Sequence, residues 1–207
     1  MRKGSSLSQT TGVVLAGGRS TRFGSDKLAA AYRGAPMLHH PVMRLAEICG
    51  EVVVVLGSGP EPSLPCEVPV RFARDREDGT GPLAGLAAGL AVVRTERALV
   101  VAGDMPDLVP AVLRALVDAG DRASADAVAL ADGGRFRPVP CVLTTSVALE
   151  QAVRLLAAGE RRFRAVLEAL DACVIDEGTW TALDPERRTL RDIDEVADLA
   201  ERGRARG

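Results

Sequence analysis

The chain has 207 residues, which is enough for one domain with a buried core and covering helices. Hydrophobic residues make up 47% of it, aromatic residues only 3%, and the formal net charge is −2. The sequence therefore lacks the basic excess and the stacking aromatics of a nucleic-acid-binding protein. No apolar run reaches membrane length, and the 4 cysteines form no C-x-x-C pair. We expect a cytoplasmic protein with free thiols.

Short apolar runs alternate with helical patterns, which predicts an α/β domain over residues 11–207 behind a flexible N-terminal tail at 1–10. The first half predicts strands at 12–16, 51–57, 68–74 and 97–102, and helices at 36–49, 81–93 and 110–119. The second half predicts two strands within 126–145, helices at 147–159 and 163–170, a strand at 173–176 and a final helix around Val196 and Leu199. Two internal glycines in the second helix, Gly85 and Gly89, indicate close packing.

The simplest assembly of these elements is a twisted, mostly parallel sheet with helices on both faces, a three-layer Rossmann-like arrangement. Open sheets of this kind bind ligands outside the carboxyl ends of their strands. Gly17 and Gly18 follow the first strand, and Asp75 and Asp104 follow later strands. We therefore expect these four residues to converge on one crevice.

The loop after the first strand combines glycines with three cations, Arg19, Arg22 and Lys27, in the run "AGGRSTRFGSDK". Its spacing matches neither the G-K-[ST] of a P-loop nor the G-x-G-x-x-G of a dinucleotide-binding turn. Backbone N–H groups between Leu15 and Gly18, with the cations, suit the wrapping of a polyphosphate. The alternative interpretation is a glycine turn with solvated charges.

Carboxylates at two places could hold a divalent cation, which triphosphate chemistry normally requires. Asp104, in "VAGDMP", is the best candidate, although a carboxylate directly after a strand is also a common turn or cap residue. Asp192 and Asp194, in "RDIDEVADL", are either a second carboxylate arm for the metal or the N-cap of the last helix.

The histidines and one charged run near the C-terminal end are interpreted as structural and not as catalytic. His39 and His40 fall in a helical stretch, where a packed or surface histidine is more common than a general base. The run 186–188, "ERR", near Trp180 is interpreted as a solvated loop.

Five segments, in chain order, resemble the molybdenum cofactor guanylyltransferase family of the nucleotide-diphospho-sugar transferase-like superfamily: "VVLAGGRSTRFGSDKLAA", "ARDREDGTGPLAGL", "VVAGDMPDL", "AAGERRFRAVLEAL" and "TLRDIDEVADL". The likeness extends over nearly the whole chain from Thr11. The pattern L-A-G-G-x-S-x-R-x-G-x-D-K is specific for this nucleotidyltransferase group, and G-P-L-A-G after an Asp-bearing strand resembles the guanylyltransferases. The resemblance implies Mg²⁺-dependent transfer of GMP from GTP to the terminal phosphate of molybdopterin, with release of pyrophosphate.

The loop pattern and the resemblance together imply roles for particular residues. The predicted nucleotide-binding residues are Leu15, Ala16, Gly17, Gly18, Lys27, Asp75, Gly81, Pro82, Leu83 and Asp104. The predicted catalytic residues are Lys27, Arg22 and Asp104, and the predicted Mg²⁺ ligands are Asp104 and Asp194. The side that receives molybdopterin is expected to carry Arg161, Arg162 and Arg137.

The sequence departs from the family's pattern in three segments. The second strand ends in Val55, Leu56 and Gly57, where the family often has an Asn; Asp192 and Asp194 replace an N-x-N-T-type motif; and Arg137 with Pro138 stands for a His-Pro element. The alternatives therefore stay open: a molybdopterin cytidylyltransferase, another sugar-phosphate nucleotidyltransferase, or an inactive nucleotide-binding homologue. Molybdenum-insertion proteins and apo-molybdoenzymes are further expected partners.

Overall fold

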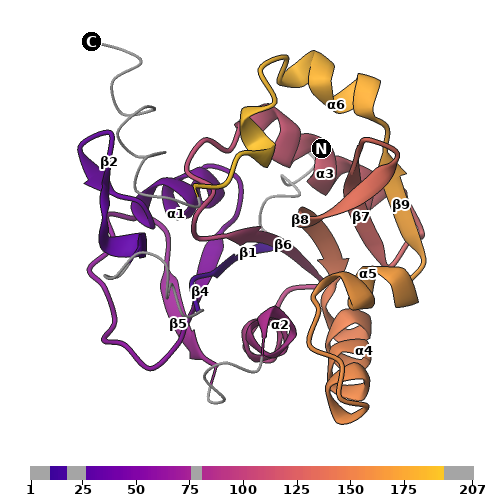
Figure 1. Cartoon of the computed structure of the whole chain (residues 1–207), viewed down its shortest axis with the longest axis horizontal. Helices are drawn as coiled ribbons and strands as arrows, with labels where there is room; N and C mark the ends of the chain where they lie inside the picture. The colour runs from indigo at the N-terminus through magenta and orange to yellow at the C-terminus, as the bar shows by residue number, and fades with distance from the viewer. Residues whose placement is uncertain (1–9, 18–26, 76–80, 194–207) are drawn as a thin grey trace, which may run out of the picture.

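The computed structural model describes residues 10–17, 27–75 and 81–193. Its centre is a 7-stranded sheet with the order β5-β4-β1-β6-β8-β7-β9 (Figure 1). The strands are β1 (Thr10–Leu15), β4 (Glu51–Leu56), β5 (Val70–Arg74), β6 (Arg97–Ala102), β7 (Ala127–Asp132), β8 (Arg135–Thr144) and β9 (Ala172–Ile175). Within this sheet β8 runs antiparallel to both of its neighbours, and the other pairings are parallel. The predicted mostly parallel sheet is confirmed.

Helices cover both faces of the sheet (Figure 1). They are α1 (His39–Ala46), α2 (Pro82–Leu90), α3 (Pro110–Arg122), α4 (Thr145–Ala157), α5 (Arg164–Ala169) and α6 (Glu177–Leu183). Helices α1, α3 and α6 contribute to one hydrophobic cluster, and α2, α4 and α5 contribute to the other. The three-layer α/β architecture predicted from the sequence is therefore correct.

The valine run of β4 explains why this strand lies inside the sheet. Val52 and Val54 belong to the cluster under α1 and α3, whereas Val53 and Val55 belong to the cluster under α2. Alternate side chains of a strand point to opposite faces, so a continuous β-branched run suits a strand that is covered on both sides. All four side chains are buried.

Helix α2 packs closely on the sheet through one of its two internal glycines. A Cβ on Gly89 would lie 2.8 Å from Val55 Cγ2 and 3.0 Å from Val13 Cγ1. A Cβ on Gly85 would meet its nearest atoms only at 3.9 Å. The prediction of close packing thus holds for Gly89, where a side chain would separate the helix from β1 and β4.

The structure contains elements that the sequence patterns did not predict. A short hairpin, β2 (Ala31–Tyr32) and β3 (Ala35–Pro36), precedes α1, so Pro36 belongs to a strand and α1 begins at His39. Helix α6 and two 3-10 turns, η2 (Lys27–Ala29) and η3 (Arg188–Leu190), were also missed. The predicted last helix around Val196 and Leu199 and residues 1–9 of the predicted tail lie outside the described residues. The tail boundary at residue 10 is wrong, because Thr10 is buried and begins β1. In the part of the chain that is described, no helix has the length and apolar character needed to cross a membrane.

Candidate functional site

Four strands end at one edge of the sheet, and backbone hydrogen bonds continue the pairing past their last residues. Ala16 N donates to Val55 O at 2.8 Å, Gly103 N donates to Leu15 O at 2.9 Å, and Asp75 N donates to Leu56 O at 2.9 Å. These bonds join the ends of β1, β4, β5 and β6. The structure therefore brings together the predicted residues Leu15, Ala16, Gly17, Asp75 and Asp104 at the carboxyl edge of the sheet.

Lys27 and Asp104 meet at this edge. The Nζ atom of Lys27 lies 3.0 Å from Oδ2 of Asp104, and the side chains are 10% and 28% exposed. A lysine this deeply placed is stable as a cation only when a negative group or several acceptors satisfy it. The pair therefore concentrates one cation and one carboxylate beside the end of β1.

The start of α2 contacts the loop that carries Arg161. Gly81 has φ +101°, a backbone conformation that favours glycine, and a Cβ there would lie 2.9 Å from Arg161 O. Leu83 N donates to the same carbonyl at 3.2 Å. Because this bond uses the Leu83 N–H, a nucleotide contact at Leu83 requires another atom of that residue. Asp75 lies close to the same helix, since its Oδ2 is 3.9 Å from the place of a Cβ on Gly85.

The two arginines predicted for the acceptor side bind atoms near them in the chain, at the end of α4 and in the loop after it. The Arg161 guanidinium donates to Leu156 O at 3.1 Å and to Glu160 O at 2.8 Å. Arg162 donates to the Glu160 carboxylate at 2.6 Å, and the backbone N–H groups of both arginines donate to it as well. These hydrogen bonds, that of the Arg162 side chain first, lower the pKa of Glu160 to about 2. Glu160 thus remains charged and neutralises Arg162 locally.

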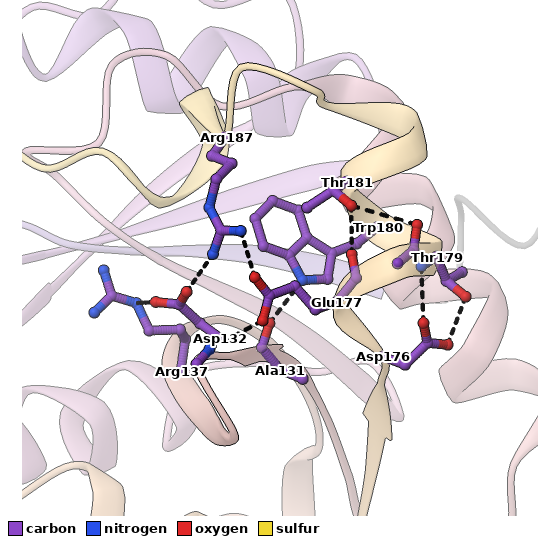
Figure 2. Close-up of polar contacts among 11 residues, drawn as sticks. Ala131, Asp132, Arg137, Asp176, Glu177, Thr179, Trp180, Thr181 and Arg187 are labelled. Carbon is purple, nitrogen blue, oxygen red and sulfur yellow. Dashed lines mark hydrogen bonds and ion pairs between the residues drawn. The ribbon is translucent and has the colours of Figure 1, made fainter.

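Arg137, the third predicted acceptor residue, lies on β8 and is paired. Its Nε is 3.4 Å from Asp132 Oδ2, and its guanidinium donates to Leu190 O at 3.3 Å. Asp132 also binds Arg187, as Figure 2 shows. Arg137 is therefore part of a charge network that ties β8 to the segment around η3.

The interpretation of 186–188 as a solvated loop is wrong for Arg187. This residue adopts a left-handed conformation with φ 55°, pairs with Asp132 and Glu177, and places its guanidinium 5.0 Å from the centre of the Trp180 ring (Figure 2). Arg187 lowers the pKa of Glu177 by hydrogen bonding to its carboxylate. Trp180 is fully buried and donates through Nε1 to Ala131 O at 2.7 Å. The network thus holds α6 against the end of β7. The single tryptophan of the sequence was a signal that could have indicated a buried contact here, and the sequence interpretation did not use it.

Asp104 is the predicted metal ligand that lies among the described residues of the site. No group of three or more His, Cys, Asp or Glu side chains suited to a metal occurs among residues 10–17, 27–75 and 81–193. The segment before Asp194 nevertheless lies beside Asp104, because Ile193 N donates to Asp104 O at 3.1 Å. Mg²⁺ in nucleotide sites is held by one or two carboxylates plus phosphates and water, and Asp104 fits that pattern. Gly18, Arg22 and Asp194 lie outside the described residues.

The family model for the MobA-like NTP transferase domain matches residues 12–174. A probable molybdenum cofactor guanylyltransferase from Chloroflexus aggregans is 35% identical over 195 residues, which cover 91% of both chains. One from Mycobacterium avium is 36% identical over 203 residues and covers 96% of this chain and 97% of its own.

Solved structures of two kinds share the fold. Molybdopterin-guanine dinucleotide biosynthesis protein A from Archaeoglobus fulgidus superposes with a TM-score of 0.75 at 23% identity, covering 93% of this chain and 96% of its own. The 2-C-methyl-D-erythritol 4-phosphate cytidylyltransferase from Thermus thermophilus gives a TM-score of 0.67 at 17% identity, covering 93% of this chain and 96% of its own. One architecture thus occurs in proteins named for different nucleotides.

Proposed function

Because this chain belongs to the MobA-like NTP transferase family, we propose that it transfers GMP from GTP to the terminal phosphate of molybdopterin cofactor. The products are a molybdopterin guanine dinucleotide and pyrophosphate. Relatives named molybdenum cofactor guanylyltransferase support this choice, since they match along nearly the full length of both chains. The structural observation that carries the proposal is the Lys27–Asp104 pair, 3.0 Å apart at the edge where β1 ends.

The reaction needs alignment and charge neutralisation more than acid–base chemistry. A phosphate oxygen of the acceptor attacks the α-phosphorus of GTP, forming a new P–O bond. The bond from the α-phosphorus to the oxygen that bridges it to the β-phosphorus breaks, and pyrophosphate leaves with that electron pair. Since the nucleophile is already an anion, the protein must mainly orient two polyanions and offset their repulsion.

Lys27 and Asp104 divide this task. Lys27 supplies a fixed ammonium for the phosphates, and its low exposure keeps solvent from weakening that charge. Asp104, with Asp194 as a second proposed ligand, would hold Mg²⁺ together with phosphate oxygens. When bound, the metal supplies Lewis-acid neutralisation of the triphosphate. Arg22 is a further proposed cation for the phosphates.

The nucleotide is proposed to lie along the ends of β1 and β5 and the start of α2. Backbone groups of Leu15 to Gly18, Asp75 and the segment Gly81–Leu83 would contact it. Molybdopterin would approach from the side of Arg161, Arg162 and Arg137. Because Glu160 and Asp132 already pair with Arg162 and Arg137, the acceptor phosphate would have to compete for these guanidinium groups. We place the reaction in the cytoplasm, with insertion proteins or apo-molybdoenzymes as recipients of the product.

A direct assay tests the proposal. The purified protein is incubated with molybdopterin cofactor, Mg²⁺ and GTP, CTP or UTP separately, and the dinucleotide is identified by mass. We expect a product only with GTP, and no product from Asp104→Asn run in parallel. A product with CTP would instead make the protein a cytidylyltransferase. Tight GTP binding without pyrophosphate release from any acceptor would make it an inactive homologue.

A further inference from the structure

The β2–β3 hairpin is joined to the loop after β6 at successive points. Lys27, just before the hairpin, pairs with Asp104. Next to it, Leu28 packs on Gly103, where a Cβ would lie 3.2 Å from Leu28 Cδ1. Farther along, the hairpin reaches Asp107. Two segments that are distant in sequence therefore run side by side from the candidate site outward.

Asp107 is the best-buried charge of this contact. Its side chain is 6% exposed, and its carboxylate accepts from Tyr32 Oη at 2.9 Å and from Arg33 Nη1 at 2.8 Å. The Arg33 guanidinium also lies 4.9 Å from the centre of the Tyr32 ring. Burial of a carboxylate is unfavourable unless donors such as these satisfy it, so the Asp107 position is tightly specified.

Tyr32 extends the contact to the backbone of Asp104. It is buried in a small cluster with Met37 and Ile193. Ile193 N in turn donates to Asp104 O at 3.1 Å. Tyr32 therefore links the hairpin to Asp107 on one side and, through Ile193, to the backbone of Asp104 on the other.

We propose that Asp107 is a positioning residue, which acts through Tyr32 and Arg33 to hold the Lys27 ammonium opposite Asp104. This inference rests on the proposed function, because it assigns Asp107 a part in that reaction. Lys27 lies in a 3-10 turn of three residues that is tied to the hairpin, since Leu38 N donates to Leu28 O at 3.1 Å. The Asp107 contacts fix this hairpin against the loop after β6 from outside the reacting atoms. A displacement of about 1 Å at a catalytic group is enough to lower turnover by up to about a hundredfold.

A double-mutant cycle on turnover tests this role. Pyrophosphate release at saturating substrates is measured for the wild type, Asp107→Asn, Lys27→Met and the double variant. We expect Asp107→Asn to lower turnover about tenfold in the wild-type background and less than about twofold when Lys27 is already absent, since coupled residues act non-additively. Equal fold-losses in both backgrounds would overturn the proposal, because a general structural effect does not depend on Lys27.

Two further variants serve as a replacement for Asp107→Asn and as a control. Tyr32→Phe removes one hydroxyl while keeping the buried ring, so the same cycle can be run with it if Asp107→Asn does not fold. Glu51→Gln is a matched control, since it breaks a half-buried Arg71–Glu51 ion pair at the start of β4, and it should leave turnover unchanged in both backgrounds. A wild type that transfers no nucleotide would contradict the proposed function and this inference together. An active wild type with an additive cycle would contradict this inference alone.

Discussion

The ammonium of Lys27 lies 3.0 Å from the carboxylate of Asp104, although 77 residues separate them in the chain. One comes from the segment after β1 and the other from the turn after β6, and the two strands are neighbours in the sheet. The two charges neutralise each other. An ammonium has three N–H donors and a carboxylate has two oxygens, so the pairing itself leaves donor and acceptor capacity for the proposed phosphate at Lys27 and the proposed metal at Asp104.

Replacing Lys27 by methionine should lower turnover about a hundredfold, because the reaction loses a preorganised cation. The side chain keeps its length, so the fold should be retained. Pyrophosphate release at saturating GTP measures the effect. Lys27→Arg keeps the positive charge but changes the shape of the charged group, so its turnover should fall less than that of Lys27→Met. Kinetics of Lys27→Met that match the wild type would remove this residue from the catalytic set.

Asp104→Asn should abolish Mg²⁺-dependent transfer while leaving the fold intact, because an amide is a weaker ligand for a hard cation than a carboxylate. Circular dichroism reports the fold, and Mn²⁺ binding followed by electron paramagnetic resonance reports the metal. We expect native dichroism with weakened Mn²⁺ binding. An unfolded variant would show that Asp104 is structural and that its assignment as a metal ligand is wrong.

Gly89→Ala should destabilise the protein by about 1–3 kcal/mol, the usual effect of inserting a methyl group into a packed core. The added Cβ would lie 2.8 Å from Val55 Cγ2, between α2 and the sheet. Chemical denaturation gives the free energy of unfolding. Gly59→Ala is the control, since nothing lies within 4 Å of a Cβ there, and its change should stay within about 0.5 kcal/mol. Similar effects at both sites would contradict the close packing of α2.

The Arg71–Glu51 pair should contribute stability that depends on pH. Hydrogen bonding from Arg71 lowers the pKa of Glu51 below its ordinary value of 4.5. A carboxyl group whose pKa is lower in the folded state than in the unfolded state stabilises the fold at any pH above its unfolded-state pKa. This stabilisation is lost as the pH falls through the folded-state pKa. The melting temperature of Glu51→Gln should therefore lie below that of the wild type at neutral pH.

The difference between the two melting temperatures should shrink as the pH drops below 4.5. Because Glu51 is partly exposed, the difference should be small and should decrease with added salt. A difference that stays constant from neutral to acidic pH would show that the Glu51 carboxylate is not the source of the stability.

The elements that the sequence predicted correctly are those with strong local patterns. The valine run of β4, the proline that opens α2 and the apolar strand before Gly103 each specify an element within a few residues. The β2–β3 hairpin and α6 were missed. The hairpin strands have 2 residues each and α6 has 7, and contacts with distant residues, such as Asp107 with Tyr32 and Trp180 with Ala131, hold them in place.

The sequence by itself determined the fold class and predicted that Gly17, Gly18, Asp75 and Asp104 converge on one crevice, because parallel strands must present their carboxyl ends at a common edge. Only the tertiary structure decided which charges meet. It paired Lys27 with Asp104 and Arg187 with Asp132, and it buried Asp107 beneath the hairpin that carries Arg33. Ion pairs depend on distances of a few ångströms between segments far apart in the chain, and no local pattern of residues encodes those distances.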